Sequence, residues 1–343
     1  AHALQAYFNQ RVQKILQKHG RKMVGWDEVL HPDLPKDIVI HSWRGQKSLF
    51  EAARQGYRGI LSNGWYIDLM QPTAQHYLVD PLPADSGLSE AEAARALGGE
   101  ATMWAEFVDP HTVDSRIWPR TAAIAERLWS PREVRDVGDM HRRLEAVSVQ
   151  LEEHGLSHEA HTARMARRIA GRRDTGALET LLGVVGPVKV YRRGQEFNKA
   201  YGRRPTQMTP LTRLVDAAIA DPAATRAFTA RVERLLGDAP AYDRDRDALR
   251  RTFDEWREAA RALDRLADTR PLLNEARSLV ADLGALADIG LEALSRLGGG
   301  GGAGAAAWRE ASLARLKEAA TPRVELEFGV IEPLQQLVEA AGK

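Results

Sequence analysis

The chain has 343 residues, carries 48 basic and 47 acidic side chains, and contains no cysteine. The formal net charge of +1 lacks the basic excess typical of nucleic-acid binders, so we expect neither nucleic acid nor an anionic membrane as a partner. Without cysteine, disulfides and thiolate metal sites are excluded. No apolar run approaches the ~20 residues that a membrane-spanning helix needs. The length suits two domains of the usual ~100 to 200 residues each.

The first segment predicts an amphipathic helix. Its sequence, "AHALQAYFNQRVQKILQKHG", ends at Gly20, and glycine readily adopts the left-handed conformation that terminates a helix. The apolar residues recur at helical spacing and share one face. They are Leu4, Phe8, Val12, Ile15 and Leu16.

Short apolar runs then alternate with helical segments up to residue 104. The runs are "KMVGW", "DIVIHSW", "YRGILSNGWY" and "ALGGEATMW", and the amphipathic segment "QKSLFEAARQG" separates the second from the third. Continuous apolar runs between helices are typical of parallel strands that are covered on both faces. This part of the chain therefore predicts an α/β fold.

Each of the four runs ends in a tryptophan or in a Trp-Tyr pair, at Trp26, Trp43, Trp65 with Tyr66, and Trp104. A single tryptophan at a strand end most often packs into a core. Ligands, however, bind at the carboxyl ends of parallel strands. Four tryptophans at equivalent positions favour a binding site.

From about residue 136 the sequence predicts amphipathic helices rich in Ala, Arg, Leu and Glu. The glycine run at residues 298–304 predicts a flexible connector between two of these helices, because glycine retains much backbone freedom. A phosphate-binding loop is the alternative, but no strand precedes the run and no Lys-Ser/Thr pair follows it.

Aromatic and acidic side chains gather at the predicted strand ends. Indole rings stack on the apolar face of a sugar, while carboxylates and a phenol hydrogen-bond its hydroxyl groups. A carbohydrate is therefore the ligand that this set fits. The set comprises Trp26, Trp43, Trp65, Tyr66, Asp68, Trp104 and Glu106. His41, His76 and His111 each lack a second histidine at ligand spacing, so we expect no metal site.

Five motifs occur in order: "MVGWDEVL", "IHSW", "SNGWYIDL", "GGEATMWAEFVD" and "SRIWPRTAAIAERLWS". Together they resemble the second half of the catalytic barrel of the family 20 β-N-acetylhexosaminidases. The resemblance implies that residues 1–150 form strands five to eight of a TIM (β/α)8 barrel. Residues 151–343 resemble the helical extension of some bacterial members, which implies an all-α second domain.

The resemblance also implies a reaction and a set of roles. In this family the substrate's own 2-acetamido carbonyl attacks the anomeric carbon, and the configuration is retained. Trp26, Trp43 and Trp104 would wall the acetamido pocket and the sugar face. Tyr66 would donate a hydrogen bond to the acetamido oxygen, and Asp68 would accept from a sugar hydroxyl. Glu106 would accept in the same way. No cofactor is implied, and the expected ligands are terminal N-acetylhexosamine glycans or chito-oligosaccharides.

The sequence departs from the family pattern at the catalytic acids. The family's orienting Asp and its general acid Glu lie in a His-x-Gly-Gly-Asp-Glu motif at the end of strand four, and no such motif occurs here. Asp27 and Glu28 follow the strand-five tryptophan, so we assign them a loop or cap role, and Glu100 a structural one. The arginine that grips the sugar is also absent, as is the stacking tryptophan that many members carry after Tyr-x-Asp.

We therefore expect a fragment that lacks the N-terminal half of its barrel and is inactive on its own. Two alternatives remain: a module that binds amino sugars without cleaving them, and an α/β domain whose aromatic residues only fill a core. A half barrel would leave two open sheet edges, which disfavours an independent binding module. The resemblance suggests a periplasmic or secreted protein, and any signal peptide would precede residue 1.

Overall fold

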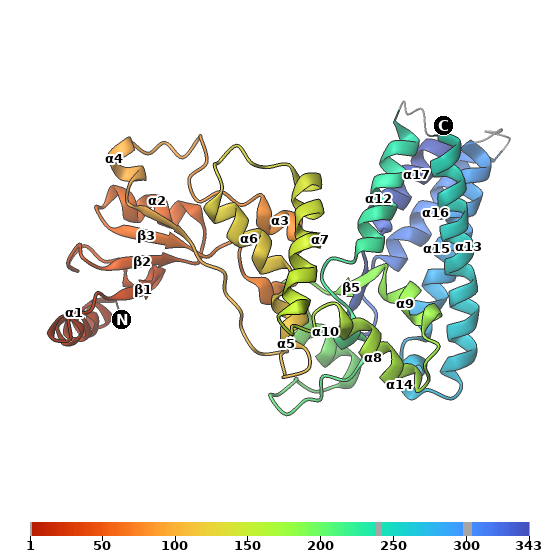
Figure 1. Cartoon of the computed structure of the whole chain (residues 1–343), viewed down its shortest axis with the longest axis horizontal. Helices are drawn as coiled ribbons and strands as arrows, with labels where there is room; N and C mark the ends of the chain where they lie inside the picture. Colours follow the sequence, from red (N-terminus) through yellow and green to blue (C-terminus); the bar gives the residue numbers. More distant parts are fainter. Residues whose placement is uncertain (1, 238–241, 298–303, 343) are drawn as a thin grey trace. The chain divides into compact units, whose positions relative to one another are not determined.

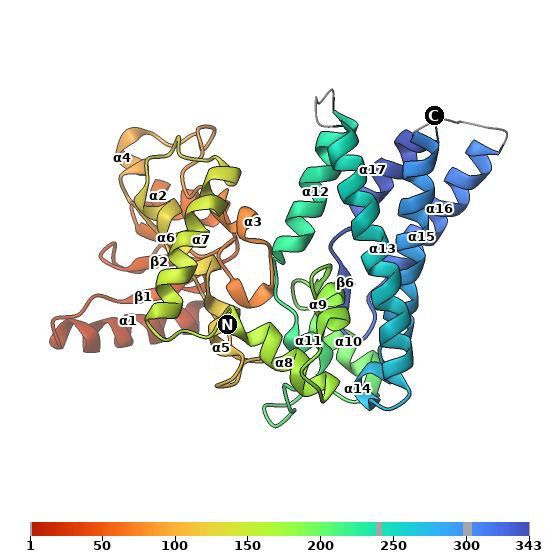
Figure 2. The ribbon, with the colours of Figure 1, turned by 45° about the vertical axis from the view of Figure 1, so that its right-hand side comes forward.

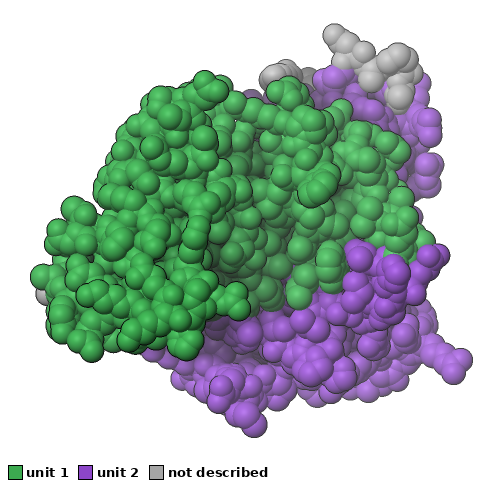
Figure 3. Space-filling view, turned by 60° about the vertical axis from the view of Figure 1, so that its left-hand side comes forward, with its two compact units in different colours: residues 1–68, 72–104, 117–150 green, residues 69–71, 105–116, 151–343 purple. Residues whose placement is uncertain are grey.

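The computed structural model describes residues 2–237, 242–297 and 304–342 (Figure 1). The chain forms two compact units, which are coloured separately in Figure 3. Unit 1 comprises residues 1–68, 72–104 and 117–150, and unit 2 comprises residues 69–71, 105–116 and 151–343. Two short segments from the first half of the sequence thus belong to the second unit.

Unit 1 is built on a four-stranded parallel sheet in the order β1-β2-β3-β4. The strands are β1 (Val24–Trp26), β2 (Val39–Ser42), β3 (Arg58–Leu61) and β4 (Ala96–Gly99). Because all four strands are parallel, their carboxyl ends lie at one edge of the sheet. The predicted α/β class with parallel strands is confirmed.

Short helices accompany this sheet. The helix α2 packs against β2 and β3 and buries Leu49 and Ala52 completely. The helices up to residue 153 are α1 (His2–Lys18), α2 (Gln46–Arg54), α3 (Thr73–Tyr77), α4 (Glu90–Ala93), α5 (Val113–Ile117), α6 (Arg120–Trp129) and α7 (Val137–Glu153), with 3-10 turns η1 (Asp27–Val29) and η2 (Ile67–Leu69). Of these, α5 belongs to unit 2 except for Ile117.

The helix α1 forms where the sequence predicts it, but its buried face only partly coincides with the predicted apolar face. Val12 and Leu16 pack against the core of unit 1, whereas Leu4, Phe8 and Ile15 are exposed and the polar Asn9 and Gln13 are buried. Gln13 donates a hydrogen bond to the Asp37 carboxylate, which compensates for the burial of its amide.

The fourth strand is shorter than the sequence indicates. We expected a strand that runs to Trp104, but β4 ends at Gly99, and its register with β3 is irregular between Gly59 and Leu61. Gly98 has φ of 120°, a conformation that interrupts regular pairing. Pairing resumes at a single parallel bridge between Tyr66 and Thr102. Trp104 therefore lies in a loop and does not end a strand.

Trp65 is a core residue and not a site residue, contrary to its place in the predicted set. Its side chain is fully buried, packs with Leu61 and Ile67, and donates a hydrogen bond from Nε1 to the His76 carbonyl at 2.9 Å. The indole occupies the space beside Gly99, where a Cβ atom would lie 1.8 Å from Cζ3 of Trp65.

Unit 2 is mainly helical, and its helices α13 and α15 pack side by side (Figures 1 and 2). Gly290 lets the two helices approach closely, because a Cβ atom there would lie 2.3 Å from the Phe253 ring. The helices are α8 (Ala160–Ala170), α9 (Gly176–Leu182), α10 (Arg192–Tyr201), α11 (Leu214–Ala217), α12 (Ala223–Leu236), α13 (Tyr242–Ala267), α14 (Pro271–Asn274), α15 (Arg277–Leu297), α16 (Ala305–Ala319) and α17 (Ile331–Ala341).

The second half of the chain is not all-α, as the sequence led us to expect. The strands β5 (Val185–Pro187) and β6 (Leu326–Phe328) pair antiparallel, with Val185 opposite Phe328. These partners are far apart in the sequence, so no local pattern reveals the pairing. Of the predicted glycine connector, residues 298–303 lie outside the described residues, and Gly304 precedes α16. No helix in the described ranges is long and apolar enough to cross a membrane.

We predict that Gly99→Ala destabilises unit 1 by ~1 to 3 kcal/mol or more, because the added methyl group would overlap the rigid indole of Trp65. Urea denaturation of the purified chain measures the change. Gly176→Ala is the matched control: a Cβ atom there meets nothing within 4 Å, so we expect no loss or a gain of ~0.4 to 1 kcal/mol. Equal stability of Gly99→Ala and the wild type would contradict this account of the packing.

Candidate active site

Two partly exposed indoles lie together in unit 1. Trp26 is the last residue of β1, and its ring centroid is 6.1 Å from that of Trp104, at an interplanar angle of 31°. Trp26 is 37% exposed and Trp104 is 47% exposed. Large aromatic side chains usually bury most of their surface, so an exposed pair at a sheet's carboxyl edge is a candidate surface for stacking on a ligand.

The ring of the buried His41 packs against the ring of Trp26. The Trp26 ring stacks on His41 at a centroid distance of 4.1 Å and an angle of 20°, because the β1–β2 register places the two residues side by side. His41 Nε2 lies 3.9 Å from Glu100 Oε1. The sequence indicated no metal at His41 and no role for it beside Trp26, because that link depends on a strand register that one strand alone does not reveal.

Trp43 follows β2 and is half-buried. Its indole Nε1 donates to Glu28 Oε2 at 3.2 Å, and the Arg44 guanidinium lies 4.7 Å from its ring centroid. Arg44 also binds Glu28 at 2.6 Å. Glu28 therefore fixes the orientation of the Trp43 ring.

Asp27 has a structural role at the same edge. Its Oδ2 accepts hydrogen bonds from the backbone N–H of Trp43 at 3.1 Å and of Arg44 at 2.9 Å. Asp27 is buried, so this carboxylate joins the end of β1 to the loop that follows β2. This structural role agrees with the loop or cap role predicted from the sequence for Asp27 and Glu28.

Tyr66 and Asp68 lie on a backbone segment that is fixed from two sides. Ile67 N donates to Thr102 O at 3.0 Å, and the buried Arg120 donates from Nη2 to Ile67 O at 2.8 Å. Tyr66 is buried but lies outside the Trp65 cluster, and Asp68 is half-buried in η2. The Tyr66–Thr102 bridge brings this segment beside the loop that leads to Trp104.

Glu106 belongs to unit 2, within the segment 105–116. That segment is capped locally, because Asp109 Oδ1 accepts from the backbone N–H groups of His111 at 2.9 Å and of Thr112 at 2.8 Å. The structure thus gathers Trp26, Trp104 and the Tyr66 segment in unit 1. The predicted role of Glu106 beside them stays a prediction.

The described residues contain no group of three or more His, Asp or Glu side chains that could hold a metal ion. The polar groups at the edge of the sheet are instead single carboxylates, a phenol and indole N–H groups. These groups suit hydrogen bonding to an uncharged ligand that carries hydroxyl and amide groups.

Residues 1–132 match the catalytic domain of glycosyl hydrolase family 20. The β-hexosaminidase of Porphyromonas gingivalis is 34% identical over 175 residues, which cover 46% of this chain and 22% of that protein. The human β-hexosaminidase subunit beta is 32% identical over 162 residues, which cover 45% of this chain and 29% of that subunit. The matches therefore span less than a third of these relatives.

A solved structure extends the likeness to the helical half. The X-ray structure of Flavobacterium johnsoniae chitobiase matches with a TM-score of 0.87 and 37% identity, and the match covers 98% of this chain and 50% of that chain. Both units of this chain therefore have counterparts there, whereas half of that protein has none here.

We predict that Asp27→Ala lowers the free energy of unfolding by ~1 to 3 kcal/mol, since it removes the charged acceptor of two part-buried backbone hydrogen bonds. Asp27→Asn should cost less, because the amide oxygen can still accept. Chemical denaturation monitored by circular dichroism gives both values. Asp33→Ala, which removes an exposed carboxylate of the same unit, is the control and should stay within ~0.5 kcal/mol of the wild type.

Proposed function

We propose that this chain forms the amino-sugar pocket of a retaining β-N-acetylhexosaminidase, because residues 1–132 match the catalytic domain of glycosyl hydrolase family 20. The substrates would be glycans that end in a β-linked N-acetylhexosamine, either GlcNAc or GalNAc. In the proposed reaction the acetamido oxygen of the substrate attacks its own anomeric carbon, so the enzyme needs to hold the acetamido group more than it needs a nucleophile.

The observation that carries the proposal is the exposed indole pair at the carboxyl edge of the parallel sheet. Trp26 and Trp104 present aromatic faces with centroids 6.1 Å apart, and Trp43 lies at the end of the neighbouring strand. We assign these three rings to the walls around the acetamido group and the sugar face. Aromatic walls exclude water, which strengthens the polar contacts made between them.

The polar roles fall to Tyr66, Asp68 and Glu106. Tyr66 would donate to the acetamido oxygen and hold it in line with the anomeric carbon, an interaction that strengthens as the bond forms. Asp68 and Glu106 would accept hydrogen bonds from sugar hydroxyls. The backbone contacts that fix the Tyr66 segment support this assignment, since a donor must be preorganised to act in the transition state.

We further propose that the chain supplies strands five to eight of the barrel. The edge strands β1 and β4 are each paired on one side only within the described sheet, and Val24 and Leu97 on them are exposed. A closed barrel has no such edges. The sequence has no His-x-Gly-Gly-Asp-Glu motif, so the general acid and the orienting Asp would come from the complementary half.

A non-catalytic amino-sugar-binding module remains the second candidate, because the indole pair is present in this chain by itself. The coding DNA upstream of Ala1 separates the two. An in-frame segment with an Asp-Glu strand end supports the enzyme, and a start codon at this point supports the binding module.

We predict that the isolated 343-residue chain hydrolyses an aryl β-GlcNAc substrate no faster than a buffer blank. General acid catalysis typically contributes ~10² to 10⁴-fold, and the residue that would provide it is absent. Release of the chromophore, followed by absorbance, measures the rate. Turnover that disappears on Asp27→Asn or Glu28→Gln would show that these acids are catalytic after all.

For the longer enzyme we predict that Tyr66→Phe lowers kcat by roughly 10 to 10³-fold with a smaller change in KM, because one preorganised donor is lost. Asp68→Asn should appear mainly in kcat/KM, since it weakens the grip on a hydroxyl. Steady-state kinetics gives both, and circular dichroism checks the fold. An unchanged kcat in a folded Tyr66→Phe variant would make Tyr66 a core-closing aromatic residue.

A further inference from the structure

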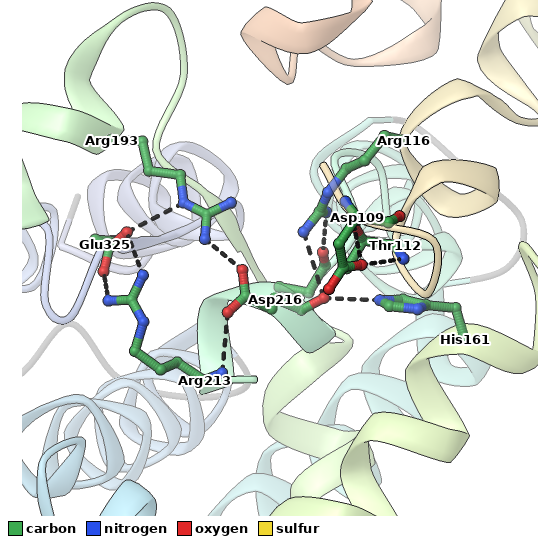
Figure 4. A network of polar contacts seen from close by, with 9 residues as sticks. Asp109, Thr112, Arg116, His161, Arg193, Arg213, Asp216 and Glu325 are labelled. Atoms are coloured by element: carbon green, nitrogen blue, oxygen red, sulfur yellow. Dashed lines mark hydrogen bonds and ion pairs between the residues drawn. The ribbon is translucent and has the colours of Figure 1, made fainter. Parts of the chain in front are cut away.

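A buried ion network lies in unit 2, in which two arginines and two carboxylates alternate (Figure 4). Arg193 binds the Asp216 carboxylate through Nη2 and Glu325 through Nε, the latter at 3.1 Å. Arg213 binds Glu325 with both terminal nitrogens, and its backbone N–H donates to Asp216 Oδ2 at 2.9 Å. Asp216 and Glu325 are fully buried, and the two arginines balance their two negative charges.

The network reaches the segment that carries Glu106. The Arg193 guanidinium lies 4.2 Å from the centroid of the Phe107 ring, and Phe107 directly follows Glu106 in the chain. The N–H groups of this guanidinium donate in its plane to Asp216 and Glu325. Its flat face is therefore available to stack on the Phe107 ring. The two carboxylates thus fix the arginine, and the arginine in turn contacts Phe107.

The other end of the same segment is attached to α11. Arg116 donates to the backbone carbonyls of Ala218 at 2.9 Å and Asp216 at 3.3 Å. The His161 ring lies between two carbonyl oxygens, that of Asp216 at 2.7 Å and that of His111 at 3.1 Å. Asp216 therefore joins both attachments, through its carboxylate on one side and its backbone carbonyl on the other (Figure 4).

A second segment is held by the residues just before Arg193. Val190 N donates to Leu69 O at 2.9 Å, and Leu69 directly follows Asp68. Val190 has φ of 62° and Met70 has φ of 57°, so both residues adopt the left-handed conformation. For valine, which is β-branched, this conformation is a genuine outlier. Such strain persists only where the surrounding structure imposes it, and it gathers at functional sites.

We propose that Arg193 is the positioning residue for Glu106 and acts through its contact with Phe107. This inference rests on the proposed function, because it assumes that Glu106 binds a hydroxyl of an N-acetylhexosamine. Its position matters for the rate, because a displacement of about 1 Å in a binding group can lower the rate by as much as ~10²-fold.

Hydrogen exchange on the 343-residue chain tests the anchoring directly. We expect Arg193→Met to raise exchange at least tenfold over residues 105–116, and Arg193→Lys to raise it less, because an ammonium keeps the charge but cannot bridge both carboxylates. Arg315→Met is the matched control. It removes an ion pair to the buried Asp282 in the same unit, and Arg315 makes no contact with segment 105–116 among the described interactions.

A less disruptive variant, Phe107→Leu, keeps the test valid if Arg193→Met does not fold. Phe107→Leu removes the aromatic ring and leaves the ion network intact, so it should raise exchange around residue 107 while the rest of unit 2 stays protected. If Arg193→Met and Phe107→Leu leave exchange over residues 105–116 at the wild-type level, the proposed anchoring is wrong.

Kinetics of the longer enzyme tests whether Arg193 acts through Glu106. We expect Arg193→Lys and Phe107→Leu each to lower kcat/KM by roughly tenfold in the wild-type background, and to lower it further by less than twofold in a Glu106→Gln background. A purely structural role would give the same loss in both backgrounds and would overturn the proposal.

The exchange and kinetic experiments together distinguish a failure of this inference from a failure of the proposed function. If the wild-type longer protein cleaves no β-GlcNAc substrate, the proposed function fails, and with it the role in positioning a sugar acceptor, whatever the exchange data show about anchoring. If it is active and the Arg193 variants match Arg315→Met in exchange and in kcat/KM, the proposed function stands and the inference fails.

Discussion

The parallel pairing of β1 to β4 is the constraint on which the candidate site depends. It places every strand's carboxyl end at one edge, so residues distant in the sequence become neighbours there. The register puts Trp26 beside His41, which supports its ring, and the Tyr66–Thr102 bridge brings the loop of Trp104 to the same edge. A slip of one residue between β1 and β2 would turn Trp26 to the opposite face of the sheet from His41.

Close packing then fixes the loops that this edge carries. The Trp65 side chain fills the space beside Gly99 and is fully buried. This packing fixes the position of the backbone immediately before Tyr66. Asp27 ties the end of β1 to the backbone after β2 through two hydrogen bonds. Neither residue belongs to the set proposed to touch the sugar. Both lower the freedom of the residues that do, and that is what a preorganised pocket requires.

Much of unit 1 could be predicted from the sequence, because apolar runs and helical spacing are local signals. The end of β1 at Trp26 and the end of β2 at Ser42, just before Trp43, follow from such runs. The end of β4 did not, since Gly98 interrupts pairing in a way that composition does not reveal. The β5–β6 pair joins segments far apart in the chain, and the contact of Arg193 with Phe107 depends on tertiary packing alone. The roles of Tyr66, Asp68 and Glu106 came from the family resemblance and stay predictions.

The boundary between the two halves of the sequence is not the boundary between the two compact units. Residues 69–71 and 105–116 follow strands of the parallel sheet, yet they belong to unit 2. Each directly follows, or contains, an acid proposed to bind a sugar hydroxyl. A loop that leaves a sheet is usually mobile unless other groups hold its backbone. The hydrogen bond from Val190 N to Leu69 O and the contact of Arg193 with Phe107 provide that hold within unit 2, and the buried carboxylates of Asp216 and Glu325 fix Arg193 in turn.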